Sequence, residues 1–173
     1  MTQKHVRVLF EVEELGWDKS LLDQLQEPIL HLVRNAIDHG IESPKERKKQ
    51  NKDSTGTLRL GANVEGGMFC LQIQDDGAGI DIDKLCIKAQ KKGIYTKKEM
   101  QALSVQQKQN LLFHPGLSSK DDVTSLSGRG MGMDIVKKNI EKLRGSLQIQ
   151  SKLGTGTTII IQVPLSVRVM HTL

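Results

Sequence analysis

Residues 31–42 read HLVRNAIDHGIE and end a predicted helix whose polar face is unusual in composition. Apolar residues recur at helical spacing over residues 18–39, and Gly40 follows as a stop signal. Four polar side chains lie at offsets of 0, 4, 7 and 8, and at about 3.6 residues per turn they share a face opposite the apolar stripe. They are His31, Asn35, Asp38 and His39. Asn, Asp and His are weaker helix formers than the Lys, Glu and Gln of solvated faces, so this face indicates a polar site.

The ligand types on this face favour a hard cation. Asn and carboxylate oxygens suit Mg²⁺, which keeps several waters and shares its ligands with substrate phosphates. A zinc site of two His and one Asp is an alternative, although no further His or Cys falls at a convincing ligand spacing. A solvated helix face, without any site, is the other alternative.

A second polar feature follows an alternating strand at residues 68–74. Asp75 ends this strand, and the chain continues as DGAGI over residues 76–80. A tight turn alone would explain the two glycines, because Gly allows positive φ. The functional interpretation is a buried carboxylate at a strand end, which can accept a hydrogen bond from an exocyclic amine such as that of adenine. Glycines beside it let a flat base approach the backbone.

A glycine-rich loop forms the third feature. Residues 128–134 read GRGMGMD and lead directly into a predicted helix. Glycines at alternate positions let the backbone approach an oxyanion, and the helix N-terminus adds free N–H groups and the positive end of its dipole. The spacing matches neither the Walker A motif nor the Rossmann fingerprint. A flexible hinge is the alternative interpretation.

The remaining pattern predicts the fold class. Helices alternate with hairpins, without regular βαβ units, which indicates a two-layer α/β sandwich with a mixed, largely antiparallel sheet covered by helices on one face. A long loop at residues 114–127 is typical of a lid. The predicted strands are residues 6–11, 57–64, 68–74, 146–151 and 157–163. Further helices are predicted at 82–92 and 133–143, and residues 97–113 are expected to contain one or two helical turns.

Composition limits the alternatives. The chain has 173 residues, which fits one domain, and it has no apolar run near the roughly 20 residues that span a bilayer. With no apolar signal-peptide core and two cysteines expected to be reduced, a cytoplasmic domain without membrane insertion is predicted. The net charge of +5 permits nucleic-acid binding, but 3% aromatic residues make it a weak competitor. The charged run at residues 45–49, with Lys52 beyond it, is interpreted as a solvated helix or loop.

These features, in this order, resemble the Bergerat-fold ATPase and kinase superfamily, which includes gyrase-type topoisomerases, mismatch-repair clamps, heat-shock chaperones and sensor histidine kinases. Residues 31–42 are similar to its N box and residues 75–80 to its first glycine box. Residues 112–116, LFHPG, are similar to the F box that opens the ATP lid. Residues 127–136 and 154–157 are similar to the last two glycine boxes.

The stretches HLVRNAIDHGIE, FHPGLSS and SGRGMGMDIVKKNI resemble more narrowly the ATP-binding catalytic domain of the CheA family of chemotaxis histidine kinases. The resemblance implies that Asn35 coordinates Mg²⁺ and that Asp75 accepts from the adenine amine. It implies a lid at about residues 114–130, although Leu117 and Ser119 stand where the family often has Phe and Thr. The other residues that it places around ATP are Arg34, Asp38, His39, Gly79, Ile80, Lys84, Lys88, Ser118, Lys120, Gly128, Arg129, Gly130, Met131, Gly132, Met133 and Thr157.

One position separates kinases from hydrolases within this superfamily. Clamp-type ATPases carry a Glu general base one turn before the Mg²⁺-binding Asn, and here that position is His31. Because water activation needs a positioned base, phosphoryl transfer to a protein histidine is favoured over hydrolysis, with a hydrolytic clamp module as the alternative. The resemblance implies an acceptor histidine on a separate domain, with a coupling protein and receptors reached through other domains. Residues 164–173 are expected to lead toward such a domain, and the isolated domain is expected to be monomeric.

Overall fold

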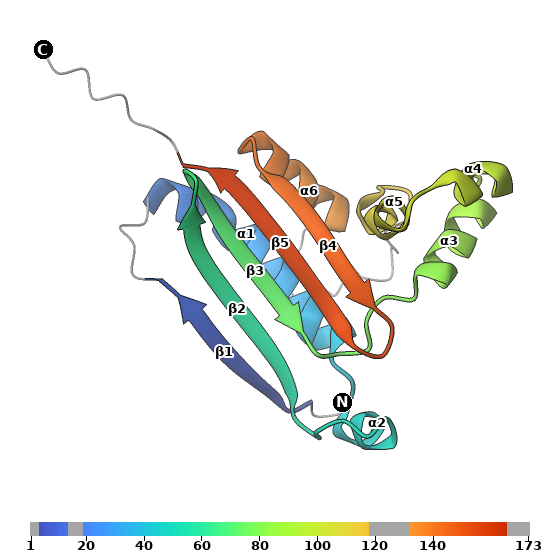
Figure 1. Cartoon of the computed structure of the whole chain (residues 1–173), viewed down its shortest axis with the longest axis horizontal. Coiled ribbons are helices and arrows are strands. Elements are labelled where there is room, and N and C mark those ends of the chain that lie inside the picture. Colours follow the sequence, from blue (N-terminus) through green and yellow to red (C-terminus); the bar gives the residue numbers. More distant parts are fainter. Residues whose placement is uncertain (1–3, 14–18, 118–131, 166–173) are drawn as a thin grey trace, which may run out of the picture.

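A computed structural model of the chain describes residues 4–13, 19–117 and 132–165, and they form a sheet with helices on one of its faces (Figure 1). The strand order is β1-β2-β3-β5-β4, in which β1 runs parallel to β2 and all other neighbours are antiparallel. The predicted mixed, largely antiparallel sheet is therefore confirmed. The strands are β1 (Val6–Val12), β2 (Gly56–Glu65), β3 (Met68–Asp75), β4 (Ser146–Lys152) and β5 (Gly156–Pro164).

The helices divide into a layer behind the sheet and a group beside it. In Figure 1, α1 and α6 cross behind the strands, whereas α3, α4 and α5 lie beyond the edge formed by β4. None of the helices within the described ranges has the length and apolar character needed to cross a membrane. The helical segments are α1 (Lys19–Asn35), η1 (Ala36–Gly40), α2 (Pro44–Lys49), α3 (Ile82–Lys91), α4 (Lys97–Ala102), α5 (Val105–Asn110), η2 (Leu111–Phe113) and α6 (Met133–Lys142).

The main core lies between the sheet and the α1–α6 layer. Successive strand residues point to opposite faces, so Phe69, Leu71 and Ile73 are buried while the residues between them face the open side. Leu25 and Leu32 of α1 complete the helical side of the core. This layering leaves Cys70, Gln72 and Gln74 on the face away from the main core, as the alternation predicted.

A second, smaller core holds α3, α4 and α5 together. Cys86, Ala89, Met100, Leu111 and Leu117 are its buried members. The single turn η2 joins the two cores, because its first residue belongs to the small core and its last, Phe113, belongs to the main core. At the start of the predicted lid, Phe113 is thus buried in the main core and Leu117 in the small core.

Two local predictions need correction. The α-helical hydrogen bonding ends at Asn35, and Ala36–Gly40 form a π-helical turn in which the Ile41 amide donates to the Ala36 carbonyl at 2.8 Å. The spacing of 3.6 residues per turn therefore does not extend to the end of the N box. The charged run at residues 45–49 is also not fully solvated. It lies in helix α2, which Ser43 caps, and Arg47 on this helix is only 1% exposed. Arg47 is buried because its guanidinium is paired with Glu42 and Asp76, as described below.

Candidate functional site

Asp75 is the last residue of β3, and its side chain lies on the helical face of the sheet, with only 6% of the residue exposed. The residue is paired in register with Thr157 at the start of β5. The Gly77 amide donates a hydrogen bond to Asp75 Oδ1 at 2.9 Å. The strand alternation and the turn after it thus place a buried carboxylate at the strand end, as the sequence predicted.

Three backbone segments meet around this carboxylate, and each passes it at a glycine. A Cβ built on Gly40 would lie 3.3 Å from Asp75 Oδ2, and one on Gly77 would lie 2.1 Å from the Gly40 carbonyl oxygen. On Gly156, where φ is +131°, it would lie 2.0 Å from the Asp75 carbonyl oxygen. Side chains at these positions would push the segments apart, so the glycines allow the end of η1, the β3 loop and β5 to converge.

Gly79 also has a packing role in the loop after β3. A Cβ on Gly79 would lie 2.2 Å from the carbonyl oxygen of Lys152, and its φ is +71°. The residue therefore lets the loop pack against the end of β4, whereas the sequence interpretation gave it only the role of making room for a base. This packing continues at Ile80, whose amide donates to Ser151 Oγ at 2.8 Å.

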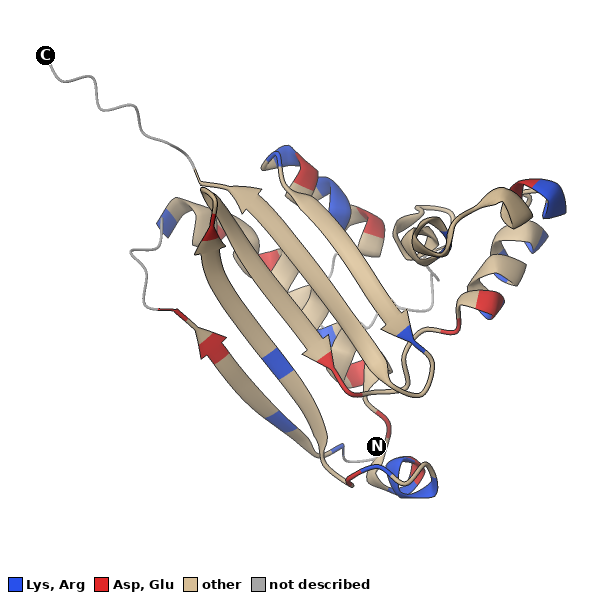
Figure 2. Cartoon of the chain, in the orientation of Figure 1, with Lys and Arg blue, Asp and Glu red and all other residues tan. Residues whose placement is uncertain are grey.

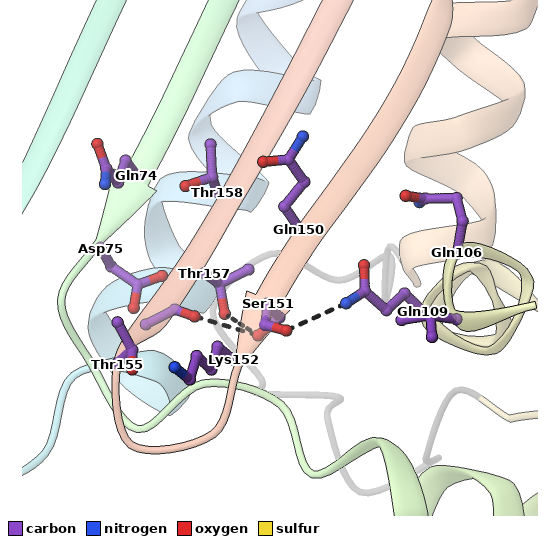
Figure 3. A pocket seen from close by; sticks show the side chains of 12 residues that line it. Gln74, Asp75, Gln106, Gln109, Gln150, Ser151, Lys152, Thr155, Thr157 and Thr158 are labelled. Atoms are coloured by element: carbon purple, nitrogen blue, oxygen red, sulfur yellow. Dashed lines mark hydrogen bonds between the residues drawn. The ribbon is translucent and has the colours of Figure 1, made fainter.

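Thr157 enters the site through the same serine. Its Oγ1 lies 2.8 Å from Ser151 Oγ, which also donates to the Gly156 carbonyl at 3.2 Å. The hydroxyl of Ser151 thus contacts Thr157 of β5 (Figure 3), and it also accepts from the Ile80 amide of the loop. Sequence reasoning missed Ser151, since a single serine on an edge strand carries no distinguishing spacing.

Burial sets the charge behaviour of Asp75. Loss of hydration raises the pKa of this carboxyl above its ordinary value, because the charged form is disfavoured away from water. The backbone amides of Gly77 and Thr157 oppose this effect, and the negative charges of Asp76 and Glu42 add to it. A buried carboxyl with a perturbed pKa in a glycine-lined recess is a candidate for recognition of a ligand.

The second part of the site lies at the end of α1. Asn35 Nδ2 lies 3.0 Å from His31 Nε2 and donates to Met133 Sδ at 3.2 Å. The amide of Asn35 thereby bridges α1 to the first residue of α6. His31 and Asn35 are partly buried, whereas three other predicted site residues on this segment are exposed: Arg34, Asp38 and His39.

The helix α6 begins beside Asn35. Gly132 is its N-cap and offers no capping side chain, while its carbonyl accepts from the Ile135 amide at 3.0 Å. The N–H groups of the first turn and the positive end of the dipole therefore point toward the Asn35 side of the site. Among the residues predicted around the phosphates, Ser118, Lys120, Gly128, Arg129, Gly130 and Met131 lie outside the described part of the chain.

The two lysines for which the resemblance implies phosphate contacts, Lys84 and Lys88, both lie on α3. Lys84 has a side chain that is 83% exposed and forms an ion pair with Asp81 at 3.2 Å. Lys88, one turn later, is partly buried. Within the described part of the chain, neither lysine forms a hydrogen bond or ion pair with Asp75 or Asn35, so their expected phosphate contacts stay predictions.

A polar pocket of 540 Å³ lies beside this site, between the open face of the sheet and α5 (Figure 3). Gln74, Thr158 and Gln150 line it from three neighbouring strands, and each alternates with a buried residue of its own strand. Gln109 of α5 closes its side and donates to the Ser151 carbonyl at 3.1 Å. The pocket and the Asp75 recess thus share the strand ends of β3, β4 and β5.

Comparison with known families identifies the class. The family described as histidine kinase-, DNA gyrase B- and HSP90-like ATPases matches residues 21–167. Because this match covers most of the chain, the chain belongs to that family. The superfamily resemblance seen in the sequence is confirmed.

Relatives narrow the class further. The chain is 41% identical to the sensor histidine kinase CheAY of Helicobacter pylori over 170 residues, which are 98% of this chain and 21% of that protein. It is 44% identical to chemotaxis protein CheA of Borreliella burgdorferi over 168 residues, 97% of this chain and 19% of that protein. The CheA protein of Salmonella typhimurium is 43% identical over 153 residues, 88% of this chain and 22% of that protein. The chain therefore spans about a fifth of the length of these curated relatives.

Solved structures confirm the fold. The histidine kinase domain of the blue-light activated histidine kinase EL346 from Erythrobacter litoralis matches with a TM-score of 0.54 and 17% identity, over 95% of this chain and 54% of that chain. Histidine kinase AdeS of Acinetobacter baumannii matches with a TM-score of 0.52 and 14% identity, over 94% and 56% of the two chains. At these identities the likeness shows the fold alone.

The raised pKa of Asp75 predicts the pH dependence of stability. The folded chain holds this proton to higher pH than the unfolded chain, so protonation stabilises the fold. The contribution is complete below the unfolded pKa and is lost as the pH rises through the folded pKa. Urea denaturation of the wild type and of Asp75→Asn across pH measures this effect. We expect the unfolding free energy of the wild type, relative to that of Asp75→Asn, to fall as the pH rises above 3.8, the ordinary pKa of the carboxyl group.

Asp81→Asn is the control for this measurement, and the pH dependence of its effect on stability should have the opposite sign. Asp81 is a helix N-cap whose pKa is lowered, chiefly by the hydrogen bond from the Lys84 amide. Its stabilising contribution is present above the unfolded pKa and is lost as the pH falls through the folded value. If the Asp75→Asn and Asp81→Asn differences changed with pH in the same direction, burial would not control Asp75.

Proposed function

We propose that the chain binds ATP with Mg²⁺ and donates the γ-phosphoryl group to a histidine on a separate domain of a chemotaxis sensor kinase. The observation that carries the proposal is the buried Asp75 carboxylate at the glycine-lined strand end of a histidine kinase-like ATPase fold. The names of the relatives support the class of reaction, since they are a sensor histidine kinase and chemotaxis CheA proteins. Within this proposal, residues 1–173 act as one catalytic domain.

Asp75 recognises the base. An ionised carboxylate only accepts hydrogen bonds, and the exocyclic amine of adenine donates one. Because Asp75 is buried, such a bond discriminates strongly against a base that lacks the donor, since the carboxylate would then lose its partner. Gly79 and Ile80 border the base, while Thr157 supports the carboxylate from the neighbouring strand.

Asn35 holds the metal. Its side-chain nitrogen is directed to His31 and Met133, so its carboxamide oxygen is the atom available as a metal ligand. One protein oxygen together with waters and phosphate oxygens fits the coordination that Mg²⁺ prefers. When bound, Mg²⁺ neutralises charge on the phosphates. Among the described residues, no group of three or more His, Cys, Asp or Glu side chains could hold a metal. In the proposed site, the nucleotide phosphates and waters supply the other ligands.

The phosphates meet the start of α6. Gly132 and Met133 present the first-turn N–H groups, and the glycines at 128 and 130 precede them in the chain. Arg34, Asp38, His39, Lys84, Lys88 and Arg129 add polar groups at the rim, and the lid at about 114–130 brings Ser118 and Lys120 to the γ-phosphate. In this arrangement the chain positions the triphosphate and neutralises its charge rather than supplying covalent chemistry.

His31 favours transfer over hydrolysis. Its Nε2 lies 3.0 Å from the Asn35 amide nitrogen, so the imidazole orients the metal ligand. No carboxylate stands at this position to activate water. The acceptor imidazole nitrogen attacks the γ-phosphorus in line, the bond from phosphorus to the β–γ bridging oxygen breaks, and ADP leaves with that oxygen.

The surroundings follow from the same proposal. The phosphoacceptor domain is the direct partner, and a coupling protein and receptors are reached through other domains. The phosphorelay is cytoplasmic, and the isolated domain is a monomer that binds no nucleic acid.

Asp75→Asn tests the base contact. The variant keeps the shape of the side chain but places a donor or a neutral acceptor against the adenine amine, so ATP affinity should fall at least tenfold, about 1.4 kcal/mol. Isothermal titration calorimetry of the chain with Mg-ATP measures this change. Asp83→Asn, on the exposed first turn of α3, is the matched control and should keep wild-type affinity. Unchanged ATP affinity in Asp75→Asn would place the base elsewhere.

Asn35→Ala tests the metal role separately. The affinity ratio between titrations with Mg²⁺ and with EDTA should drop about tenfold, because the metal loses its protein ligand. Affinity in EDTA should stay within about twofold of the wild type, since the base contact is intact. Asn110→Ala, at the exposed end of α5, controls for loss of an amide. If Asn35→Ala keeps the wild-type ratio between the affinities with Mg²⁺ and with EDTA, other residues hold the metal.

Transfer of label distinguishes a kinase from a hydrolase. With γ-labelled ATP, the chain should place acid-labile phosphate on a separately supplied histidine-bearing domain of this kinase class, and not on the same domain with its histidine replaced by Gln. Sustained phosphate release without an acceptor would instead identify a hydrolytic clamp module. Efficient ATP binding without transfer to any such domain would also contradict the kinase proposal.

A further inference from the structure

A partly buried ion cluster lies at the loop that follows Asp75, with Arg47 and Glu42 as its buried members. Arg47 of α2 contacts Glu42 Oε2 through Nη1 at 3.1 Å and Asp76 Oδ2 through Nη2 at 2.9 Å. Its Nη1 also donates to Asp76 Oδ1 at 3.1 Å and to the Asp76 carbonyl at 3.2 Å, while Nε donates to the Asp53 carbonyl at 2.6 Å. The guanidinium thus grips both the side chain and the backbone of Asp76.

Lys52 completes the cluster. Its Nζ contacts Glu42 Oε1 at 2.7 Å, the Asp76 carbonyl at 3.0 Å and the Gly77 carbonyl at 2.7 Å. These three bonds equal the number of N–H donors on an ammonium group. The side chain of Lys52 is only 17% exposed, because its ammonium group is directed toward these acceptors. This is so although Lys52 follows the charged run at residues 45–49.

The cluster acts on the two residues that follow Asp75. Asp76 Oδ1 also accepts from the Thr57 amide at 2.8 Å, which ties the loop to the start of β2. Gly77 is held on both sides: its carbonyl accepts from Lys52, and its amide donates to Asp75 Oδ1. A shift of the Gly77 peptide would therefore move a donor that orients the Asp75 carboxylate.

Stability alone does not account for such a cluster. A buried ion pair costs desolvation energy, and well-packed apolar side chains of similar volume often stabilise a fold as much or more. Two positive and two negative groups with directed hydrogen bonds instead specify one geometry. The geometry that they specify is that of the backbone at Asp76 and Gly77, directly beside Asp75.

We infer that Lys52 and Arg47 are positioning residues for base recognition, and that the cluster of Glu42, Arg47, Lys52 and Asp76 holds the loop so that Asp75 meets the exocyclic amine of the purine. This inference rests on the proposed adenine contact of Asp75. It extends the site to α2 and to Lys52, which touch no part of the ligand themselves. The specificity for an amino-purine therefore depends on residues in the charged run.

Lys52→Met removes the ammonium group but keeps an unbranched apolar side chain. Calorimetry should compare the wild type and this variant with Mg-ATP and with the Mg²⁺ complex of purine riboside 5′-triphosphate, which has hydrogen in place of the amine. We expect the ATP Kd to rise about tenfold while the Kd of the analogue stays within about twofold, because only ATP uses the oriented carboxylate. Lys48→Met, on the exposed side of α2, is the matched loss of charge and should change neither value.

The preference for ATP over the analogue distinguishes positioning from a general loosening of the fold. Equal weakening of both nucleotides in Lys52→Met, or no change in either, would overturn the inference. If Lys52→Met does not fold, as thermal unfolding would show, Lys52→Gln retains a donor for the carbonyls and should reduce the preference in the same direction. Arg47→Lys keeps the charge but loses the planar fork, and it should also reduce the preference.

Asp75→Asn separates the proposed adenine contact from the positioning role of the cluster. If that variant keeps the wild-type preference for ATP over the analogue, the proposed adenine contact itself fails. If Asp75→Asn loses the preference and Lys52→Met keeps it, only the positioning role of the cluster fails.

Discussion

The Gly40 carbonyl accepts a hydrogen bond from the Ala78 amide at 2.8 Å, and the rest of the site depends on this main-chain contact. It joins the end of η1 to the loop after β3, which brings the helix that carries Asn35 beside the strand that carries Asp75. The contact exists only because Gly77 has no Cβ, which would lie 2.1 Å from the Gly40 carbonyl oxygen. The segment that follows Asn35 and the loop that follows Asp75, 40 positions apart in the chain, thus meet where Gly77 has no side chain.

The buried carboxylate of Asp75 makes this region less stable than an apolar strand end would be. Burial raises the pKa of Asp75, and Asp76 and Glu42 add negative charge nearby. The amides of Gly77 and Thr157 offset part of that cost without removing it. Arg47 and Lys52 neutralise the two neighbouring acids instead. The positive charges are thus paired with the two neighbouring acids, Glu42 and Asp76.

The sequence predicted the parts of this structure that depend on short-range pattern. The alternation before Asp75 identifies β3 and the buried face, since a strand has period two. It could not identify Arg47 as buried, because a Lys- and Glu-rich run after Pro44 has the composition of a solvated helix. The burial of Arg47 depends on Asp76, which lies 29 positions later. The π-helical turn at Ala36–Gly40 likewise follows from packing of the helix end against the loop, which no local periodicity records.

The group of helices at the sheet edge is joined to the site mainly by polar bonds to the backbone. It has its own small core, and α5 reaches β4 through Gln106 Nε2 on the Ile149 carbonyl at 3.0 Å and Gln109 Nε2 on the Ser151 carbonyl at 3.1 Å. The hydroxyl of that same serine bonds Ile80 and Thr157. One hydrogen-bond network therefore connects α5, the β4 edge and the loop beside Asp75. Because hydrogen bonds are directional, the position of α5 and the geometry of the Asp75 loop constrain each other through Ser151.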